Sequence, residues 1–428
     1  SLTASTGDVT LGFVSAGTAA ADVAIIATVG RIIDNGNDTA TDVTGDVVTL
    51  TASGDIGQTL NLHIDTAANS LTTSSNSAVV GGAHGTWINE VDAVTVTSAT
   101  TTDGVIVITS GGTQTDTLVN AGGTNRNVLL RTTAGDIVLG LVTATGDGVR
   151  LDSAAGVTDG DIVDDNDIDS LNLSISAVTG VGSAAAIDTT VANLEVFNST
   201  SGDVNITNTG ALTIAAVGPL FGDAISGATN NGGNLTIIAL SPLTVAAPVS
   251  ASGIVTLTAT DSGVGDDLTI NATVTSTGNN IVLNAGDNAA INASLFATAA
   301  TRTITINIDT GAAVDAAGGV LTIIGADLDA TTAFFNGNVN DDSFGTLLNP
   351  LTPDDDTPFV IDGDAPHGTP TGDKLFLAIP LVGTTLTVTD FGSGVFGFGA
   401  SPASVTYTSI EELNVTGGTY DLTIDLNA

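Results

Sequence analysis

The sequence contains no cysteine and no methionine, and only 6 of its 428 residues are lysine or arginine. Without cysteine, neither disulfide bonds nor thiol chemistry is open to the fold or to a site. So few basic residues argue against a nucleic-acid partner, because phosphate binding requires clustered lysine and arginine. The same shortage argues against binding to an anionic membrane surface. No apolar run reaches the roughly 18 residues of a membrane span, so we expect no membrane insertion.

Acidic residues dominate the charge. The 46 aspartates and glutamates give a net charge of −40, so the natural counterparts of the chain are cations, above all Ca²⁺. Aromatic residues make up only 4% and charged residues 12%, whereas 42% are hydrophobic. This balance argues against disorder. Small β-branched residues in place of aromatic ones suit a narrow core in which stacked coils supply the burial.

The repeat pattern is clearest in residues 232–295, which contain six short alternating segments separated by turns rich in Gly, Asn, Asp and Ser. Their central apolar residues are Ile237, Val245, Leu257, Ile270, Leu283 and Ile291, and Ala259, Ala272 and Ala285 follow one 13-residue step. No gap has room for a crossover helix, so parallel neighbours must be successive coils of a solenoid. Two strands per coil give a coil of roughly 20 to 26 residues. The sequence predicts an all-β fold, a parallel β-solenoid with almost no α-helix.

A Gly-Asp-Val/Ile motif recurs along the chain, at residues 7–9, 45–47, 54–56, 135–137 and 202–204. Glycine supplies a corner with positive φ, and valine or isoleucine starts the next strand. We expect each aspartate to accept a hydrogen bond from the backbone of its own turn.

Two departures from the pattern suggest the domain organisation. Residues 67–89 are less regular and include Trp87, the only tryptophan, which we interpret as covering a flank of the solenoid; a binding tip is the alternative. Residues 333–428 hold eight of the 12 phenylalanines and seven of the 10 prolines. We therefore expect β-solenoid repeats over residues 1–332, with an irregular insertion at about 67–89, and a compact C-terminal all-β domain over residues 333–428.

Two acidic runs are candidate metal sites. Crowded carboxylates repel each other unless a cation lies among them, although a solvated acidic turn is the alternative. The spacing is not that of a calcium-binding helix-loop-helix. We expect Ca²⁺ in a structural role as the cofactor. The candidate ligands are Asp161, Asp164, Asp165, Asp167, Asp169, Asp354, Asp356, Asp362 and Asp364.

The ends of the chain suggest self-assembly. Residues 2–9 repeat the pattern of residues 50–56, so we expect them to lie inside a coil without a cap, at a processed end or in a piece of a longer chain. Residues 419–426 alternate cleanly, and again no cap follows. Contact between uncapped ends is head-to-tail and propagates as a filament. The expected interface residues are Leu2, Val9, Tyr420, Leu422, Ile424 and Leu426.

The sequence runs GDVTL (7–11), GDVVTLTASGDI (45–56) and GDVNITNTGALTIAAV (202–217) resemble repeats of giant bacterial surface proteins, the filamentous-haemagglutinin-like and autotransporter-like adhesins. The resemblance covers most of the chain but includes no catalytic residues. It implies an exported, right-handed parallel β-helix that is extracellular or at the cell surface of a bacterium. The calcium-binding nonapeptide of the RTX proteins is absent, so their sites are not transferred.

Three classes of function remain open. The composition favours a structural subunit of an extracellular filament, surface layer or matrix, whose partners are copies of itself. A glycan-binding adhesin module is the alternative, whereas irregular threonine spacing argues against ice binding. A β-helix enzyme that degrades polysaccharides is the third reading. A glycosidase needs two carboxylates in one groove, which no sequence feature locates, and a lyase needs basic residues, so we expect no enzyme.

Overall fold

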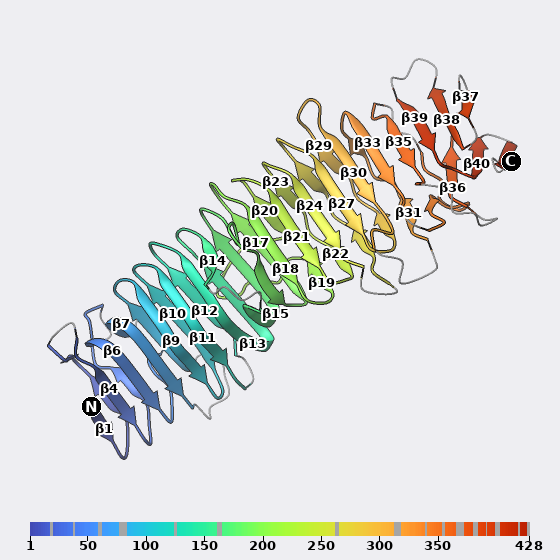
Figure 1. Ribbon diagram of the computed structural model, residues 1–428. Helices are drawn as coiled ribbons and strands as arrows, with labels where there is room; N and C mark the ends of the chain where they lie inside the picture. The colour runs from blue at the N-terminus through green and yellow to red at the C-terminus, as the bar shows by residue number, and fades with distance from the viewer. Residues whose placement is uncertain are drawn as a thin grey trace. The chain divides into compact units, whose positions relative to one another are not determined.

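The computed structural model describes all residues except 18–19, 37–38, 59–61, 77–83, 124–125, 161–164, 262–264, 312–317, 339, 353–355, 365–371, 380–383, 391, 399–402, 418–419 and 426–428. The protein is all-β, with no helix in the described residues, and forms a parallel β-solenoid of about 14 turns (Figure 1). The predicted fold class is therefore confirmed. No described helix is long and apolar enough to cross a membrane.

The chain divides into two compact units. The first contains residues Ser1–Ile206 and Ala216–Ile225, and the second contains Thr207–Ala215 and Ser226–Ala428. The strands of the first unit are β1 (Leu2–Ala4), β2 (Val9–Leu11), β3 (Val14–Ser15), β4 (Val23–Ala27), β5 (Ile32–Asp34), β6 (Val43–Ala52), β7 (Ile64–Ser75), β8 (Gly85–Glu90), β9 (Val94–Thr101), β10 (Val105–Ser110), β11 (Gln114–Ala121), β12 (Val128–Thr132), β13 (Ile137–Asp152), β14 (Val157–Asp159), β15 (Ile168–Ala177), β16 (Ile187–Thr190) and β17 (Asn193–Asn198); β18 (Val204–Asn208) spans the division.

Long strands that bend around the corners of the coil characterise the first unit. Strand β13 is 16 residues long and pairs in parallel with β14, β11, β12 and β15 along its course. Its pairing with β15 shifts between Ala144 and Gly148, which marks a bulge at the bend. Residues 67–75 and 85–89 belong to β7 and β8, both in parallel ladders, so the less regular sequence there contains regular strands.

The second unit contains β19 (Leu212–Ile214), β20 (Ala228–Asn230), β21 (Leu235–Ala239), β22 (Leu243–Val245), β23 (Val249–Ala251), β24 (Val255–Ala259), β25 (Leu268–Ile270), β26 (Val274–Ser276), β27 (Ile281–Ala285), β28 (Ala289–Ile291), β29 (Leu295–Ala297), β30 (Thr303–Asn307), β31 (Val320–Ile323), β32 (Leu328–Asp329), β33 (Thr332–Asn336), β34 (Ser343–Phe344), β35 (Phe359–Asp362), β36 (Lys374–Ala378), β37 (Thr384–Asp390), β38 (Ser393–Phe398), β39 (Ser404–Thr408), β40 (Glu412–Gly417) and β41 (Tyr420–Asp425).

Three separate parallel sheets build this second unit. One runs from β20 through β23, β26 and β29 to β32, the next from β21 through β24, β27, β30, β33 and β35 to β39, and the last from β19 through β22, β25, β28, β31, β34 and β36 to β40. Each regular coil thus has three strands, not the two that the sequence suggested. The missed strand begins soon after another short one, as β23 begins at Val249 after β22 ends at Val245, so the sequence pattern did not separate the two.

The predicted register and coil length are correct for the strands that were recognised. Ile237 pairs with Leu257 and Leu257 with Leu283, in coils of 20 and 26 residues. Val245, Ile270 and Ile291 form the equivalent column on the next sheet. Ala259 pairs with Ala285, but Ala272 lies outside the strands, so the 13-residue step did not follow one column.

Aspartates at the corners join one coil to the next. The Oδ1 atom of Asp8 accepts the backbone N–H of Arg31 at 2.9 Å, and that of Asp136 accepts the N–H of Gly156 at 2.7 Å. Asp55 accepts from Gly85 in the same way, at 3.0 Å. The expectation that these aspartates bond their own turn was therefore wrong. At a corner the backbone ladder is interrupted, and a carboxylate replaces the missing carbonyl acceptor for the following coil.

Parallel stacking continues across residues 332 and 333, because β33 pairs with β30 on one side and with β35 on the other. Beyond that point, antiparallel strands appear: β37 pairs with β38, β38 with β39 and β40 with β41. Aromatic residues fill this part of the core, where Phe335 and Phe359 lie 5.0 Å apart between ring centroids. The predicted domain boundary at residue 333 stays a prediction.

Candidate functional site

The predicted metal ligands are spread over several places in the described part of the chain. Asp161, Asp164 and Asp354 lie outside the described residues. Asp167 is buried, and its Oδ2 atom accepts the N–H of Asp188 at 2.8 Å, which is a coil-joining contact. Among the described residues, no group of three or more His, Cys, Asp or Glu side chains is arranged to hold a metal ion.

The other predicted ligands lie at two separate places. Asp356, Asp362 and Asp364 are exposed, and Asp362 accepts hydrogen bonds from the Thr408 hydroxyl at 3.0 Å and from the Asp364 N–H at 3.2 Å. Asp165 and Asp169 line a surface hollow of the first unit. Calcium binding stays a prediction.

This corner hollow has a volume of about 580 Å³. It lies over β11, β13 and the segment that leads into β15, where the coil bends. Its lining combines hydroxyl, amide and carboxylate groups with one exposed leucine. The lining residues are Thr115, Asp116, Thr117, Leu139, Gly140, Leu141, Thr143, Gly160, Asp165, Asn166 and Asp169.

Two glycines of the hollow have no room for a side chain. A Cβ atom on Gly140 would lie 2.7 Å from the carbonyl oxygens of Asp116 and Thr117, and one on Gly160 would lie 2.6 Å from that of Leu139. Because these neighbours are backbone atoms, they have no rotamer by which to move aside.

The polar groups of the hollow differ in availability. The Oδ1 atom of Asn166 accepts from the Thr190 hydroxyl at 2.9 Å, and the Oδ2 atom of Asp169 accepts from Thr145 at 3.3 Å. Asp116 shares its register with the interior residues Val96 and Leu139, so its side chain points into the solenoid, where Gln114 Nε2 donates to it at 2.9 Å. Burial raises the pKa of Asp116 to about 7.

A second polar site lies on the outside of the first unit. Residues that pair in register form an outer row, one residue per coil: Trp87, Val107, Leu129, Arg150, Ser174 and Glu195. The segment Ala216–Ile225, which we call the strap, belongs to the same compact unit.

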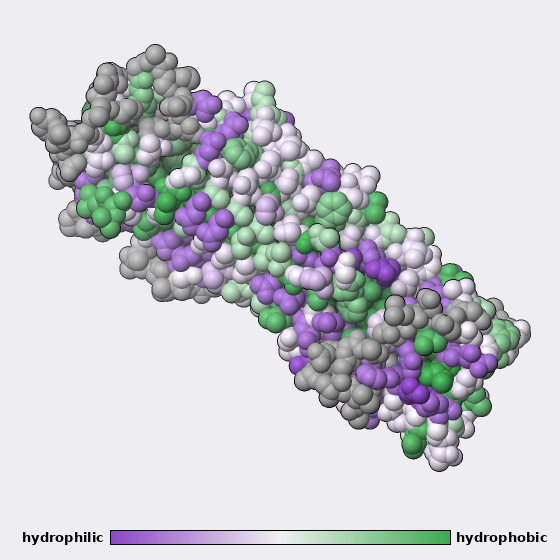
Figure 2. Space-filling view, turned by 180° about the vertical axis from the view of Figure 1, so that it is seen from behind, coloured by the Kyte–Doolittle hydropathy of each residue, from purple (hydrophilic) through white to green (hydrophobic). Residues whose placement is uncertain are grey.

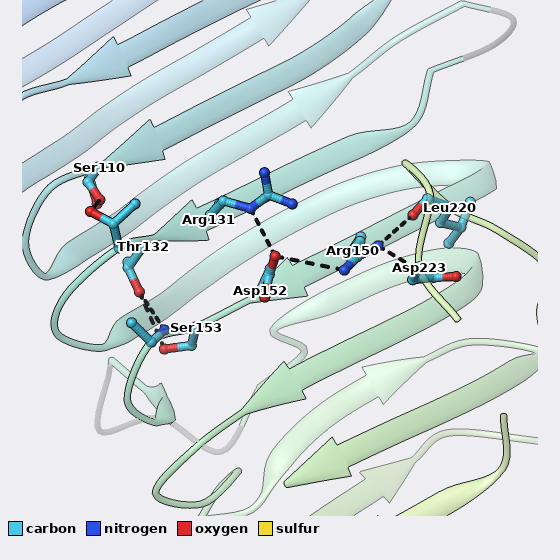
Figure 3. Close-up of polar contacts among 10 residues, drawn as sticks. Ser110, Arg131, Thr132, Arg150, Asp152, Ser153, Leu220 and Asp223 are labelled. Carbon is cyan, nitrogen blue, oxygen red and sulfur yellow. Dashed lines mark hydrogen bonds and ion pairs between the residues drawn. The ribbon is translucent and has the colours of Figure 1, made fainter. Parts of the chain in front are cut away.

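Arg150 is the centre of the polar contacts at this row (Figure 3). Its Nη1 atom donates to the carbonyl oxygen of Leu220 at 2.9 Å and lies 3.6 Å from the Asp223 carboxylate. Asp152 is shared, because Arg131 Nε binds it at 2.8 Å and Arg150 Nη2 lies 3.7 Å away. Two of the six basic residues of the chain are therefore used here.

Trp87 lies at the start of the outer row. Its ring stacks on His63, with centroids 5.6 Å apart and planes 16° from parallel. Trp87 and Phe221 pack against a cluster of buried apolar residues, Val105, Val107 and Leu129. The interpretation of Trp87 as a cover on the solenoid flank is confirmed. Sequence reasoning missed the strap, although Phe221 is conspicuous as an aromatic residue within a glycine-rich stretch.

The predicted assembly residues occupy varied positions. Leu2 is 46% exposed on β1, whereas Val9 is buried. Tyr420, Leu422 and Ile424 lie on β41, which pairs with β40, and Leu426 lies outside the described residues. Figure 2 shows hydrophilic and hydrophobic residues interspersed on the face that it draws.

No protein-family model matches the chain, and no curated protein or solved structure matches it. The resemblance to bacterial surface proteins therefore extends only to the architecture, a β-helix repeat protein.

Proposed function

We propose that the protein is a structural subunit of an extracellular filament, surface layer or matrix, which assembles from copies of itself. The observation that carries the proposal is the way polar side chains join successive coils. In the described part of the chain, these side chains bond one coil to the next along the solenoid. Such a chain is suited to resisting deformation along the stacking direction.

Asparagine side chains illustrate these inter-coil contacts in the second unit. The Nδ2 atom of Asn307 donates to the Oδ1 atom of Asn284, and Asn336 donates to Asn307, each at 2.7 Å. Asn284 in turn donates to the Thr258 hydroxyl at 3.0 Å. Four coils are thus joined by one line of side-chain hydrogen bonds outside the backbone ladder. Repeated amide ladders of this kind add stability to stacked parallel strands.

The first coil offers a surface for assembly. Strands β1, β2 and β3 each pair with one neighbour within the described part of the chain. Leu2 and Phe13 are 46% and 66% exposed at this edge. One-sided strands with exposed apolar side chains favour the addition of further strands. We propose that a coil of a second copy stacks here.

Electron microscopy and sedimentation of the purified protein over a range of concentrations test this proposal. We expect particles that grow along one axis. The double variant Leu2→Asp/Phe13→Asp should keep its β-sheet circular dichroism and stop growing, because charge at the edge opposes stacking. Leu240→Asp is the matched control, since Leu240 is also exposed, at 41%, but lies in the second unit.

A stable monomer at high protein concentration, with both edge residues intact, would contradict the assembly proposal. Growth of the edge variant to the same length as the parent would contradict the role of β1–β3 and leave assembly itself standing.

The corner hollow favours a second candidate function, glycan binding. Its carboxylates and hydroxyls suit the hydroxyl groups of a sugar, and Leu141, 39% exposed, supplies an apolar contact. A glycan array followed by calorimetry on any hit tests this candidate. We expect Asp169→Asn combined with Thr117→Ala to weaken binding by at least about tenfold, the loss of one net hydrogen bond. Thr256→Ala, on the second unit, should have no effect, and an array without hits excludes this function.

A further inference from the structure

The outer row differs from the rest of the solenoid exterior. Strand residues that point outward are generally half-exposed and polar, as Thr256, Thr258 and Thr269 are on the second unit. In the outer row, by contrast, Val107 and Leu129 point outward and are only 3% and 5% exposed. Trp87, at the start of the row, and Phe221 of the strap both pack against their cluster. An apolar outer surface of this kind requires a cover.

The strap binds this surface through side chains and single backbone groups, not through a β-ladder. Its Phe221 ring packs on the apolar cluster, and its Asp223 carboxylate accepts from Ser174 at 2.8 Å beside Arg150. At the far end of the row, Glu195 Oε2 accepts the N–H of Val217 at 3.0 Å. Recognition therefore depends on an aromatic residue followed two positions later by a carboxylate.

The strap is a closed loop that is independent of the parallel ladder. Its two ends meet within the second unit, where the N–H of Gly227 donates to the carbonyl oxygen of Ala215 at 3.2 Å. It contains no strand. Gly218 and Gly222 have φ values of 81° and 82°, and Phe221 has a φ of 51°, a conformation that costs a phenylalanine about 1–3 kcal/mol. Such a loop can leave its surface without breaking any strand pairing.

We propose that the outer row is a docking groove for a strap, and that it accepts the strap of a second copy of this chain in place of its own. The strap of a second copy fits this groove because it carries the same Phe221 and Asp223. Charge supports this pairing at one point, where the Asp223 carboxylate of the strap lies 3.6 Å from Arg150 Nη1.

This inference rests on the proposed structural function. In dilute solution the chain's own strap occupies the groove, because a linked segment has an effective concentration in the millimolar range. At high protein concentration, in solution as in an assembly, the strap of a neighbour competes with it. Exchange then links two solenoids side by side, a low-cost route to association between identical chains.

The absence of cysteine allows a clean crosslinking test. A Cβ atom on Gly148 would lie 2.6 Å from a methyl carbon of Leu220, so cysteines at these two positions meet when the strap is bound. Gly148→Cys and Leu220→Cys chains are purified separately, mixed at high concentration and oxidised. Exchange predicts disulfide-linked dimers containing one chain of each kind. A mixture of Gly148→Cys and Thr256→Cys chains measures dimers formed by random collision. The yield of dimers from the first mixture should be at least about tenfold higher.

The double variant Gly148→Cys/Leu220→Cys reports on the same contact within one chain. If it locks as a monomer and the mixture gives no more dimer than the collision control, the strap stays in its own groove and the proposal is overturned. A second measurement applies whether or not the double variant locks. A peptide of residues 215–226 is added to a chain whose strap is replaced by a short Gly-Ser linker, and Trp87 emission is followed.

If the peptide binds and its Phe221→Ala variant does not, the result supports the docking groove. If the peptide leaves Trp87 emission unchanged, the proposal is overturned. These readouts need no filament, so a failure of strap exchange is distinguishable from a failure of end-to-end assembly.

Discussion

In the first unit one strand bends around the corners of a coil and continues, whereas in the second unit each side of the coil has a short strand of its own. Strand β13 uses 16 residues in one run, but β23, β24 and β25 use 3, 5 and 3. Continuous strands keep the backbone ladder intact around a corner, at the expense of bulges that disturb the alternation of side chains. Short strands keep the alternation regular and leave the corners to glycine, asparagine and aspartate.

The interiors differ accordingly. In β21, β24 and β27 every second residue is a buried aliphatic one. The first unit also buries polar groups inside its strands, whereas the buried carboxyls Asp342 and Asp373 of the second unit lie outside the strands. Glu90 accepts from the Thr66 hydroxyl at 2.6 Å and from the N–H of Val91 at 3.0 Å, and Gln114 pairs with Asp116. Bending a strand leaves backbone and side-chain groups that only buried polar partners satisfy.

The largest expected effect is in the aliphatic interior of the second unit. Leu283 is fully buried between Leu257 and Ile306 of the adjoining coils. Leu283→Ala should lower the free energy of unfolding by about 2–5 kcal/mol, through lost burial and the cavity that remains. Denaturant unfolding measures the loss, and hydrogen exchange shows whether it stays within the second unit.

Val282→Ala is the matched control, since Val282 lies on the same strand with its side chain pointing outward. An equal loss from both substitutions would mean that the two faces of the strand are equally buried. It would contradict an interior filled by every second residue of β27.

The corners of the first unit should be nearly as sensitive. Gly85 has a φ of 135°, and a Cβ atom there would lie against the carbonyl oxygen of Val105 in the next coil. Gly85→Ala should cost about 1–3 kcal/mol, because only glycine adopts this conformation readily. Gly12→Ala has no atom within 4 Å of its Cβ and should leave stability within about 0.5 kcal/mol. Thermal melts of both variants check this, and equal melting temperatures would contradict it.

Individual residues show which parts of the fold the sequence predicts. The alignment on Leu257 and Leu283 predicted the correct register, because alternation survives wherever strands are short and straight. Bulges hide the same period in the first unit, and β26 begins so soon after β25 that the pattern did not separate the two strands. The strap was missed for another reason. Its contacts join Asp223 to Ser174, 49 residues away, and no local pattern encodes a partner at that distance.

Buried carboxyls make the second unit sensitive to pH. Burial raises the pKa of Asp342 to about 7 and that of Asp373 to about 8, from an ordinary value of 3.8. Because both values are raised on folding, their contribution to stability is complete below about pH 4 and is lost as the pH rises toward 8. The loss is at most about 1.4 kcal/mol per pH unit for each carboxyl.

Denaturant unfolding at a series of pH values measures this slope. Asp373→Asn keeps an oxygen that accepts the Asp342 N–H, a contact of 2.6 Å, but does not titrate, so it should reduce the slope of stability against pH, while Asp342 still contributes. A variant whose slope equals that of the parent would show that Asp373 does not carry the effect.

The smallest expected effect is in the asparagine line on the outside of the second unit. Asn307 donates to Asn284 and accepts from Asn336, and Asn307→Ala removes both hydrogen bonds. Its side chain is only half-buried, so water replaces much of what is lost, and we expect a cost of about 1 kcal/mol. Thr305→Ala, on the same strand and face, is the control and should change stability by less than about 0.5 kcal/mol. If the two variants unfold at the same denaturant concentration, the amide line adds nothing to the backbone ladder.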